Sequence, residues 1–221
     1  MDWVALELSL RLAMLTCAIL IPLAVVLARA LAWRRFAARG MVEALVALPL
    51  VLPPTVLGFY LLVAFGGGSP IGRAFETMFG HTLVFTFSGI LLASIIFNLP
   101  FAVQPLQRAF EAVPREVREA AWCSGLTPWQ TFWRIELPLA WPGVLSAFAL
   151  TFTHTLGEFG VVLMVGGSIP GETRTIAISI YDRVQAFDDA AAGTMSLFLL
   201  ALSFVAITLV YSFSLRRRSD G

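Results

Sequence analysis

Lysine is absent from this chain of 221 residues, and all 15 of its cationic side chains are arginines. The phosphate-binding loop of P-loop ATPases requires a lysine that reaches the terminal phosphates, so this chain cannot contain that loop. If ATP drives the activity of this protein, a separate chain must hydrolyse the nucleotide. No cofactor is therefore expected in this chain.

Charged residues of either sign are also scarce. They make up 13% of the chain, whereas hydrophobic residues make up 58%. Soluble domains carry about 25% charged residues. This composition predicts an all-α integral membrane protein, and the length leaves room for a single transmembrane domain over residues 1–221.

The residues needed for enzymatic chemistry are few. The chain has 2 cysteines and 2 histidines, and they show no metal-ligand spacing. No Gly-x-Ser-x-Gly motif and no tandem aspartates occur in its apolar segments. These absences argue against an intramembrane enzyme, so neither catalytic residues nor a metal site are expected.

Five apolar segments are long enough to cross a membrane, because about twenty apolar residues in a helix span a hydrocarbon core of about 30 Å. The expected spans are residues 9–32, 41–65, 83–107, 142–166 and 194–215. The second of them is not a regular helix, because Pro49, Pro53 and Pro54 each remove a backbone donor. Such breaks are typical of transport pathways, although a packing kink is the alternative.

The distribution of arginines orients these spans, since cytoplasmic loops carry an excess of positive charge. An N-terminus outside the cell places most of the arginines in the cytoplasm: Arg29, Arg34, Arg35, Arg39, Arg108, Arg115, Arg118, Arg134, Arg216, Arg217 and Arg218. The remaining ones are expected outside or near the outer interface: Arg11, Arg73, Arg174 and Arg183. Residues 113–138 and the C-terminus are thus predicted to be cytoplasmic.

Residues 113–138 form the longest polar stretch of the chain. A short helix is expected from Arg115 to Ser124, ended by Gly125 in the left-handed conformation. Thr127-Pro128-Trp129-Gln130 then has the pattern of a capping box and predicts a second short helix, which Pro138 should end with a turn. A helix–corner–helix between two spans suits the docking of another protein.

The spacing in this stretch resembles the cytoplasmic EAA loop of ABC importer permeases: EAA, three residues, G, nine residues, I, one residue, LP. The matching residues are Glu119, Ala120, Ala121, Gly125, Ile135, Leu137 and Pro138. The resemblance implies a type I ABC importer permease fold, whose cytoplasmic coupling helix contacts the ATPase. It also implies a homodimer in the bacterial inner membrane, two cytoplasmic ATPase subunits that bind ATP and Mg²⁺, and an external oxyanion-binding protein.

Residues 48–72 and 156–188 further resemble the permeases of molybdate ABC importers. This likeness implies molybdate as the cargo, without separating it from tungstate. Sulfate and thiosulfate permeases have a related glycine-glutamate-aromatic-glycine pattern and remain the nearest alternative. A secondary anion transporter is a more distant alternative, and no repeat between the halves of the chain supports it.

Glu158 is the acidic residue that lies well inside an expected span, and such residues are functional candidates. His154 lies four residues earlier on the same helical face, which allows a hydrogen-bonded pair. A carboxylate repels an anion in low dielectric, so Glu158 is expected to hold a gate rather than the cargo. A purely structural buried pair is the alternative. The expected translocation path or gate comprises Pro53, Pro54, His154, Gly157, Glu158 and Phe159.

Two further segments have helical or polar character. Residues 174–190 place Ile176, Ile180, Val184 and Phe187 at helical spacing, which predicts an amphipathic helix at the outer interface. In the third span, Asn98 and Gln104 are expected to join helices by hydrogen bonds rather than to contact the cargo.

Overall fold

The computed structural model describes the backbone of residues 1–219, and the side chains of residues 1–208 and of Ser212. The described residues form helices and no strands, as the composition predicts. The elements in order are α1 (Trp3–Trp33), α2 (Arg39–Val51), α3 (Pro54–Phe65), α4 (Pro70–Phe79), α5 (Phe87–Glu111), α6 (Arg115–Cys123), α7 (Pro128–Thr131), the π-helix η1 (Phe132–Glu136), α8 (Leu137–Leu156), α9 (Gly160–Gly166), α10 (Ile176–Gln185) and α11 (Asp189–Ser219).

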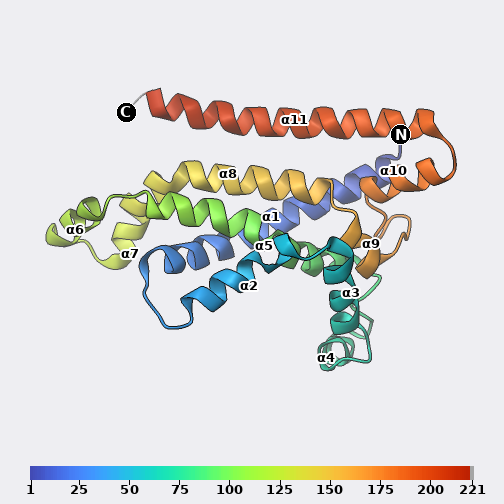
Figure 1. The fold of residues 1–221 in the computed structure, drawn as a ribbon, viewed down its shortest axis with the longest axis horizontal. Helices are drawn as coiled ribbons and strands as arrows, with labels where there is room; N and C mark the ends of the chain where they lie inside the picture. Colours follow the sequence, from blue (N-terminus) through green and yellow to red (C-terminus); the bar gives the residue numbers. More distant parts are fainter. Residues whose placement is uncertain (220–221) are drawn as a thin grey trace.

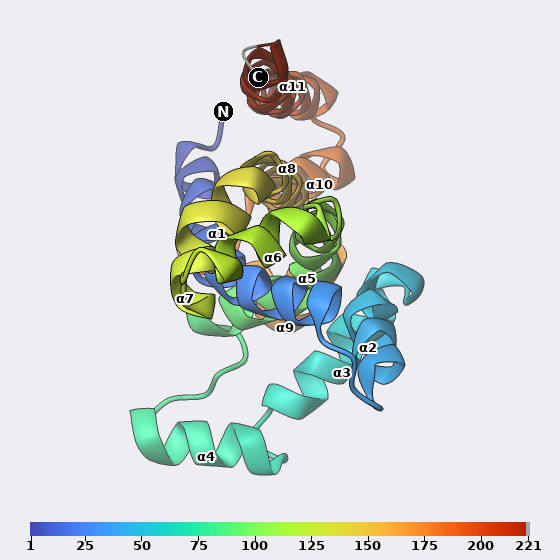
Figure 2. The same ribbon diagram turned by 90° about the vertical axis from the view of Figure 1, so that its left-hand side faces the viewer.

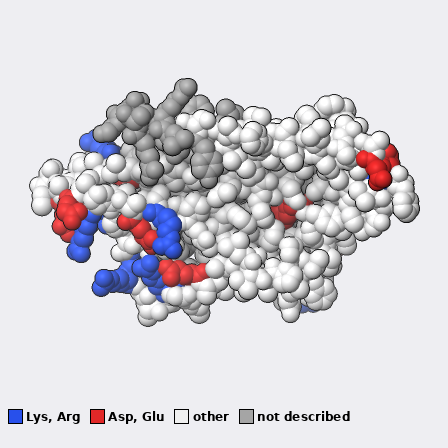
Figure 3. All heavy atoms as spheres, turned by 45° about the horizontal axis from the view of Figure 1, so that its top comes forward, with Lys and Arg blue, Asp and Glu red and all other residues white. Residues whose placement is uncertain are grey.

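Helices α1, α5 and α8 pack against one another along the long axis of the molecule, and α11 lies against α8 (Figure 1). The short helices α6 and α7 lie at one end of this bundle, whereas α9 and α10 lie at the other. Charged side chains gather at the α6 end on the face shown in Figure 3. The side chains of Arg216, Arg217 and Arg218, which are expected in the cytoplasm, lie outside the described residues.

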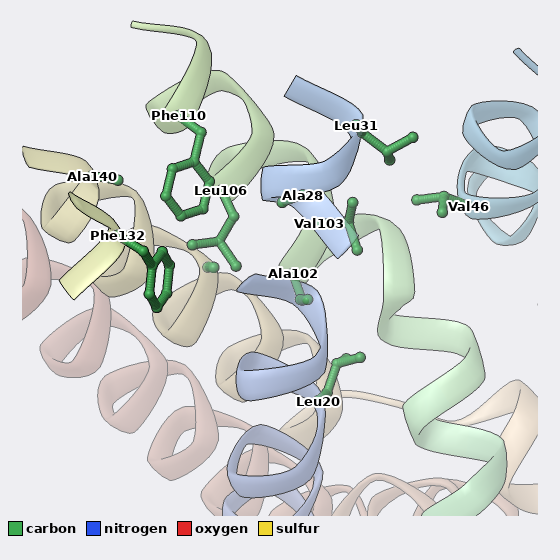
Figure 4. Close-up of a cluster of buried hydrophobic side chains, with 12 residues drawn as sticks. Leu20, Ala28, Leu31, Val46, Ala102, Val103, Leu106, Phe110, Phe132 and Ala140 are labelled. Atoms are coloured by element: carbon green, nitrogen blue, oxygen red, sulfur yellow. The ribbon is translucent and has the colours of Figure 1, made fainter. Parts of the chain in front are cut away.

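The largest apolar cluster joins α1, α2, α5, η1 and α8 next to the α6 end (Figure 4). Leu20 and Leu31 of α1, Leu106 and Phe110 of α5, and Phe132 of η1 contribute large side chains to it. Burying a side chain of this size contributes about 1.5–3 kcal/mol to stability. This cluster therefore packs the membrane-type helices together next to the short helices α6 and α7.

Within the part of the chain that the structure describes, four stretches are long and apolar enough to cross a membrane, and they cover Trp3–Trp33, Phe87–Glu111, Pro128–Leu156 and Asp189–Thr208. Helices α2 and α3 together would make a fifth, bent by 113°. This agrees with the expectation of about five spans. The helix at the fourth expected span, 142–166, has other bounds than that span, because it begins well before Pro142 and ends at Leu156.

The break in the second span follows from its prolines. A residue that precedes proline is pushed out of the helical region. Leu52 and Pro53 each precede a proline, and both adopt ψ of 137°. Pro54 then begins α3, where its missing N–H leaves no bond unmade. Pro53 and Pro54 thus divide the second span into two short helices, whereas Pro49 lies inside α2.

The outer amphipathic segment is shorter than expected. Helix α10 ends at Gln185, and Phe187 has a positive φ of 58° with 92% of its surface exposed. The prediction that Phe187 belongs to the apolar face of this helix was therefore wrong. Hydrogen bonds join the start of α10 to α1 and its N-cap. The Ile176 N–H donates to Ser9 Oγ at 2.8 Å, and Ser179 Oγ donates to Asp2 Oδ2 at 2.9 Å.

Helix α4 lies apart from the bundle of long helices (Figure 2).

Candidate functional site

The corner between α6 and α7 has the expected backbone geometry. Helix α6 ends at Cys123, and Gly125 adopts the left-handed conformation with φ of 83°. The Gly125 N–H donates to the Trp122 carbonyl at 2.9 Å, and the Leu126 N–H donates to the Ala121 carbonyl at 3.1 Å. These bonds satisfy carbonyls that the end of α6 leaves free. The prediction of a glycine corner is confirmed.

The second helix starts with the predicted capping box. The Gln130 N–H donates to Thr127 Oγ1 at 3.3 Å, and the Thr127 N–H donates to Gln130 Oε1 at 2.9 Å. Pro128 occupies the first turn of α7, where it costs no hydrogen bond. This reciprocal pair satisfies two N–H groups at the helix start and sets the direction in which the chain leaves the corner.

The expected turn at Pro138 is wrong, because α7, η1 and α8 follow one another without a break. Pro138 lies in the first turn of α8. The π-helical turn before it resolves the steric problem, since the Leu137 N–H bonds to the Phe132 carbonyl five residues back. This wider turn displaces the carbonyl that a proline would strike in a regular α-helix. Residues 128–156 are thus one helical unit.

The motif residues divide between surface and interior. Glu119, Ala120 and Gly125 are exposed at the end of the molecule, and Glu119 pairs with Arg115 at 2.7 Å. Ala121 is buried and lets α6 approach the chain that follows it. Ile135 and Leu137 are partly buried on η1 and α8, whereas Pro138 is exposed. The exposed side of α6 is not covered by other described residues and is therefore accessible to a partner.

A buried polar network lies at the opposite end of α8, where the helix is broken. Glu158 is 4% exposed and follows the last residue of α8 by two positions. Its Oε2 accepts hydrogen bonds from Ser94 Oγ at 3.0 Å and from Asn98 Nδ2 at 3.4 Å. Its Oε1 is buried and has no partner among the described residues. The carboxyl group therefore joins the break to α5.

The direct pair of His154 with Glu158 does not form. Helix α8 ends at Leu156 with Gly157 as its cap, so the two residues no longer share one helical face. His154 Nδ1 lies 3.0 Å from Asn98 Oδ1, and Asn98 thus bridges the histidine and the carboxyl group. The His154 ring stacks on Phe101, with centroids 3.9 Å apart.

Ser94 and Asn98 were not among the predicted site residues. Asn98 joins helices as expected, but it does so at the candidate gate. The two residues are four positions apart and therefore share a face of α5. That spacing of small polar residues in an apolar helix was the available signal. Gln104, by contrast, is exposed.

The two broken spans meet at this network. Helix α3 packs on α9, and a Cβ built on Gly160 would lie 2.8 Å from Pro54 Cβ. A cavity of about 550 Å³ lies between them. It is lined by Pro54, Thr55, Phe97, Thr153, His154, Gly157, Glu158, Phe159 and Gly160. The structure thus brings together all the predicted gate residues except Pro53, which lies next in the chain to the lining residue Pro54.

Close packing of α3 on α9 gives a testable prediction. A Cβ at Gly58 would lie 2.7 Å from Met164 Cβ and 3.2 Å from Val161 Cα. We expect Gly58→Ala to destabilise the protein by about 1–3 kcal/mol through overpacking, seen as a lower midpoint of thermal unfolding in detergent.

Gly193→Ala is the matched control, because Gly193 also lies in a helix and a Cβ there meets nothing within 4 Å. Alanine favours a helix over glycine by about 1 kcal/mol at either position. Equal shifts of the unfolding midpoint in the two variants would contradict close packing between α3 and α9.

Comparison with known proteins identifies the family. Residues 20–219 match the family described as "Binding-protein-dependent transport system inner membrane component". The chain belongs to this family. It is similar to the molybdenum transport system permease protein ModB of Azotobacter vinelandii, with 47% identity over 211 residues, 96% of this chain and 93% of the relative. ModB of Escherichia coli (strain K12) is 34% identical over 218 residues, 99% of this chain and 95% of the relative.

A relative that is named as a sulfate transport permease has a lower sequence identity to this chain. The probable sulfate transport system permease protein cysT of Chlorella vulgaris is 32% identical over 183 residues, which are 83% of this chain and 68% of the relative.

Solved structures show the same fold at low identity. A chain in the crystal structure of a bacterial ABC transporter involved in the import of the acidic polysaccharide alginate matches with a TM-score of 0.78 and 17% identity, over 96% of this chain and 78% of that chain. A chain of the inward-facing MetNI methionine ABC transporter matches with a TM-score of 0.70 and 18% identity, over 96% and 92%. The chain is therefore a membrane-spanning protein with the ABC importer permease fold, as its EAA motif implies.

Proposed function

We propose that this chain is the permease subunit of an ATP-driven importer that carries molybdate or tungstate into the cytoplasm. The observation that supports coupled transport is the corner of α6, Gly125 and α7, which presents Glu119 and Ala120 at the surface. The molybdenum transport permeases among its relatives support the cargo. ATP and Mg²⁺ are bound by two separate cytoplasmic ATPase subunits, and a second copy of this chain completes the membrane unit.

Transport proceeds by alternating access. Closure of the ATPase pair around ATP moves α6, and the movement opens the cavity outward; hydrolysis returns it inward. An external binding protein supplies the cargo and, like the nucleotide, shifts the population between the two states through different affinities for each. High affinity for the cargo belongs to the binding protein, so the permease requires only a weakly lined path.

The continuous helix from Pro128 to Leu156 provides a direct mechanical route. Its 29 residues extend for about 44 Å at 1.5 Å per residue. One end lies at the coupling corner, and the other lies two residues from Glu158. Movement of the corner therefore displaces one side of the gate relative to α5, which carries Ser94 and Asn98.

The orientation proposed for the bacterial inner membrane puts the N-terminus outside and α6 in the cytoplasm. It is supported by the arginines at the α6 end and by the positive-inside rule. The start of α1 and the described end of α11 lie at opposite ends of the bundle (Figure 1), which is consistent with an odd number of crossings.

Uptake by proteoliposomes tests this function. The permease is reconstituted with its ATPase and binding protein, and labelled molybdate is measured inside the vesicles with and without ATP. We expect ATP-dependent uptake that excess tungstate suppresses and excess sulfate does not. Suppression by sulfate would favour the sulfate permease that the Chlorella relative suggests. Uptake that persists without ATP and the ATPase subunit would favour a secondary transporter.

A further inference from the structure

Glu136 is a fully buried carboxylate at the α6 end of the molecule, with a side-chain exposure of 0%. It lies in η1 between the motif residues Ile135 and Leu137, at a position that the motif leaves open. Its oxygens accept from two arginines on different helices. Arg29 Nε of α1 donates to Oε2 at 2.5 Å, and Arg118 Nε of α6 donates to Oε1 at 2.9 Å. We call these three residues the ion triad.

Aromatic rings hold both arginines of the triad in place. The Arg118 guanidinium carbon lies 3.4 Å from the centre of the Trp33 ring and 5.0 Å from that of Trp122. The Arg29 guanidinium carbon lies 5.2 Å from the centre of the Phe132 ring. Such contacts are strongest when the cation is removed from water. Each arginine therefore has one defined position relative to Glu136.

The triad is the principal buried connection of α6 to the membrane helices. Ala121 is the buried residue among the described residues of α6, and it is small. Arg118 is 12% exposed, whereas Arg115 on the same helix is 82% exposed and pairs with Glu119 at the surface. Exposed ion pairs contribute little to stability. The position of α6 thus depends on Arg118 far more than on Arg115.

Stability alone is a weak explanation for the triad. Removing charges from water is costly, and apolar replacements of buried ion networks are often as stable or more stable. What an ion triad provides is directional contact, because a planar guanidinium fits a carboxylate in a restricted geometry. Glu136 applies this geometry at a point where α1, α6 and the α7–η1–α8 unit meet.

We propose that Glu136 is a positioning residue that connects the coupling helix α6, through Arg118, to α1 and to the α7–η1–α8 unit. Displacement of α6 by the ATPase then moves both membrane helices rather than bending the corner alone. The inference rests on the proposed function, in which α6 contacts the ATPase.

Arg118→Gln tests the connection most cleanly, because Arg29 still neutralises Glu136 and the buried charge stays paired. In the reconstituted complex we expect molybdate taken up per ATP hydrolysed to fall at least about fivefold, with the ATPase still bound. By hydrogen exchange and mass spectrometry, amides of residues 115–124 should exchange at least about tenfold faster. Arg108→Gln is the matched control: Arg108 is 82% exposed at the same end and pairs with Glu111. It should change neither measurement.

If Arg118→Gln takes up as much molybdate per ATP hydrolysed as the wild type, the proposal is overturned. This holds even if amide hydrogen exchange in α6 becomes faster, because the triad would then be structural only. Arg29→Gln provides a second variant that removes the α1 connection alone, and it should lower uptake per ATP without faster exchange in α6. If the wild-type complex imports no molybdate, the proposed cargo fails. Two measurements on Arg118→Gln then still test whether the triad positions α6. They are the rate of amide hydrogen exchange in α6 and the response of ATP hydrolysis to the binding protein.

Discussion

Gly125→Val is expected to lower ATP-dependent uptake by about tenfold while the chain still inserts into the membrane. Gly125 has φ of 83°, and a side chain in this left-handed region costs about 1–2 kcal/mol or more when it is β-branched. Each 1.4 kcal/mol corresponds to about tenfold in an equilibrium. The strain is relieved by moving α6 out of the position that the corner imposes. Uptake and ATP hydrolysis, measured together in proteoliposomes, report the uncoupling.

Gly80→Val is the matched control for this experiment. Gly80 has φ of 75° at the end of α4, and a Cβ meets nothing within 4 Å at either glycine. The two variants therefore introduce the same backbone strain at two separate places, the end of α4 and the corner after α6 (Figure 1). Gly80→Val should leave the ratio of uptake to ATP hydrolysis unchanged. Full uptake in Gly125→Val, with normal binding of the ATPase, would remove the coupling role from this corner.

Glu158→Gln is expected to raise the basal ATP hydrolysis of the assembled complex about fivefold, without loss of ATPase binding. The carboxyl oxygen Oε2 accepts from both Ser94 and Asn98. A glutamine can place its single acceptor oxygen where Oε2 lies and keep both contacts, because Oε1 has no partner among the described residues, but an uncharged amide accepts more weakly than a carboxylate. A hydrogen bond to a charged group contributes about 1.5–3 kcal/mol. Weaker contacts destabilise the conformation described here and let the complex hydrolyse ATP without cargo.

Glu172→Gln makes the same chemical change at an exposed position in the outer loop between α9 and α10 and serves as the control. It should leave basal hydrolysis and uptake unchanged. If Glu158→Gln behaves like this control in both assays, Glu158 is a structural residue and the gate must lie elsewhere in the cavity.

Local features of the fold were predictable because they depend on neighbouring residues. The left-handed corner at Gly125 and the capping box of Thr127 and Gln130 involve bonds over three to five residues. The break before Pro54 has a similarly short-range cause in the steric effect of each proline on the residue before it. Pro138 failed as a turn signal because a π-helical turn absorbs its clash, and propensity does not reveal that register change.

Composition and motif spacing by themselves determined that this chain is an α-helical membrane protein of the ABC importer permease class. The helix–corner–helix of residues 113–138 also follows from its own residues. The tertiary structure decided which side chains contact one another between helices of the bundle. Ser94 and Glu158 are 64 positions apart, and Arg29 and Glu136 are 107 apart. Contacts at such separations depend on how the helices pack, because a buried charge is stable only where the fold supplies its partners. Sequence patterns describe each helix face but not the face it meets.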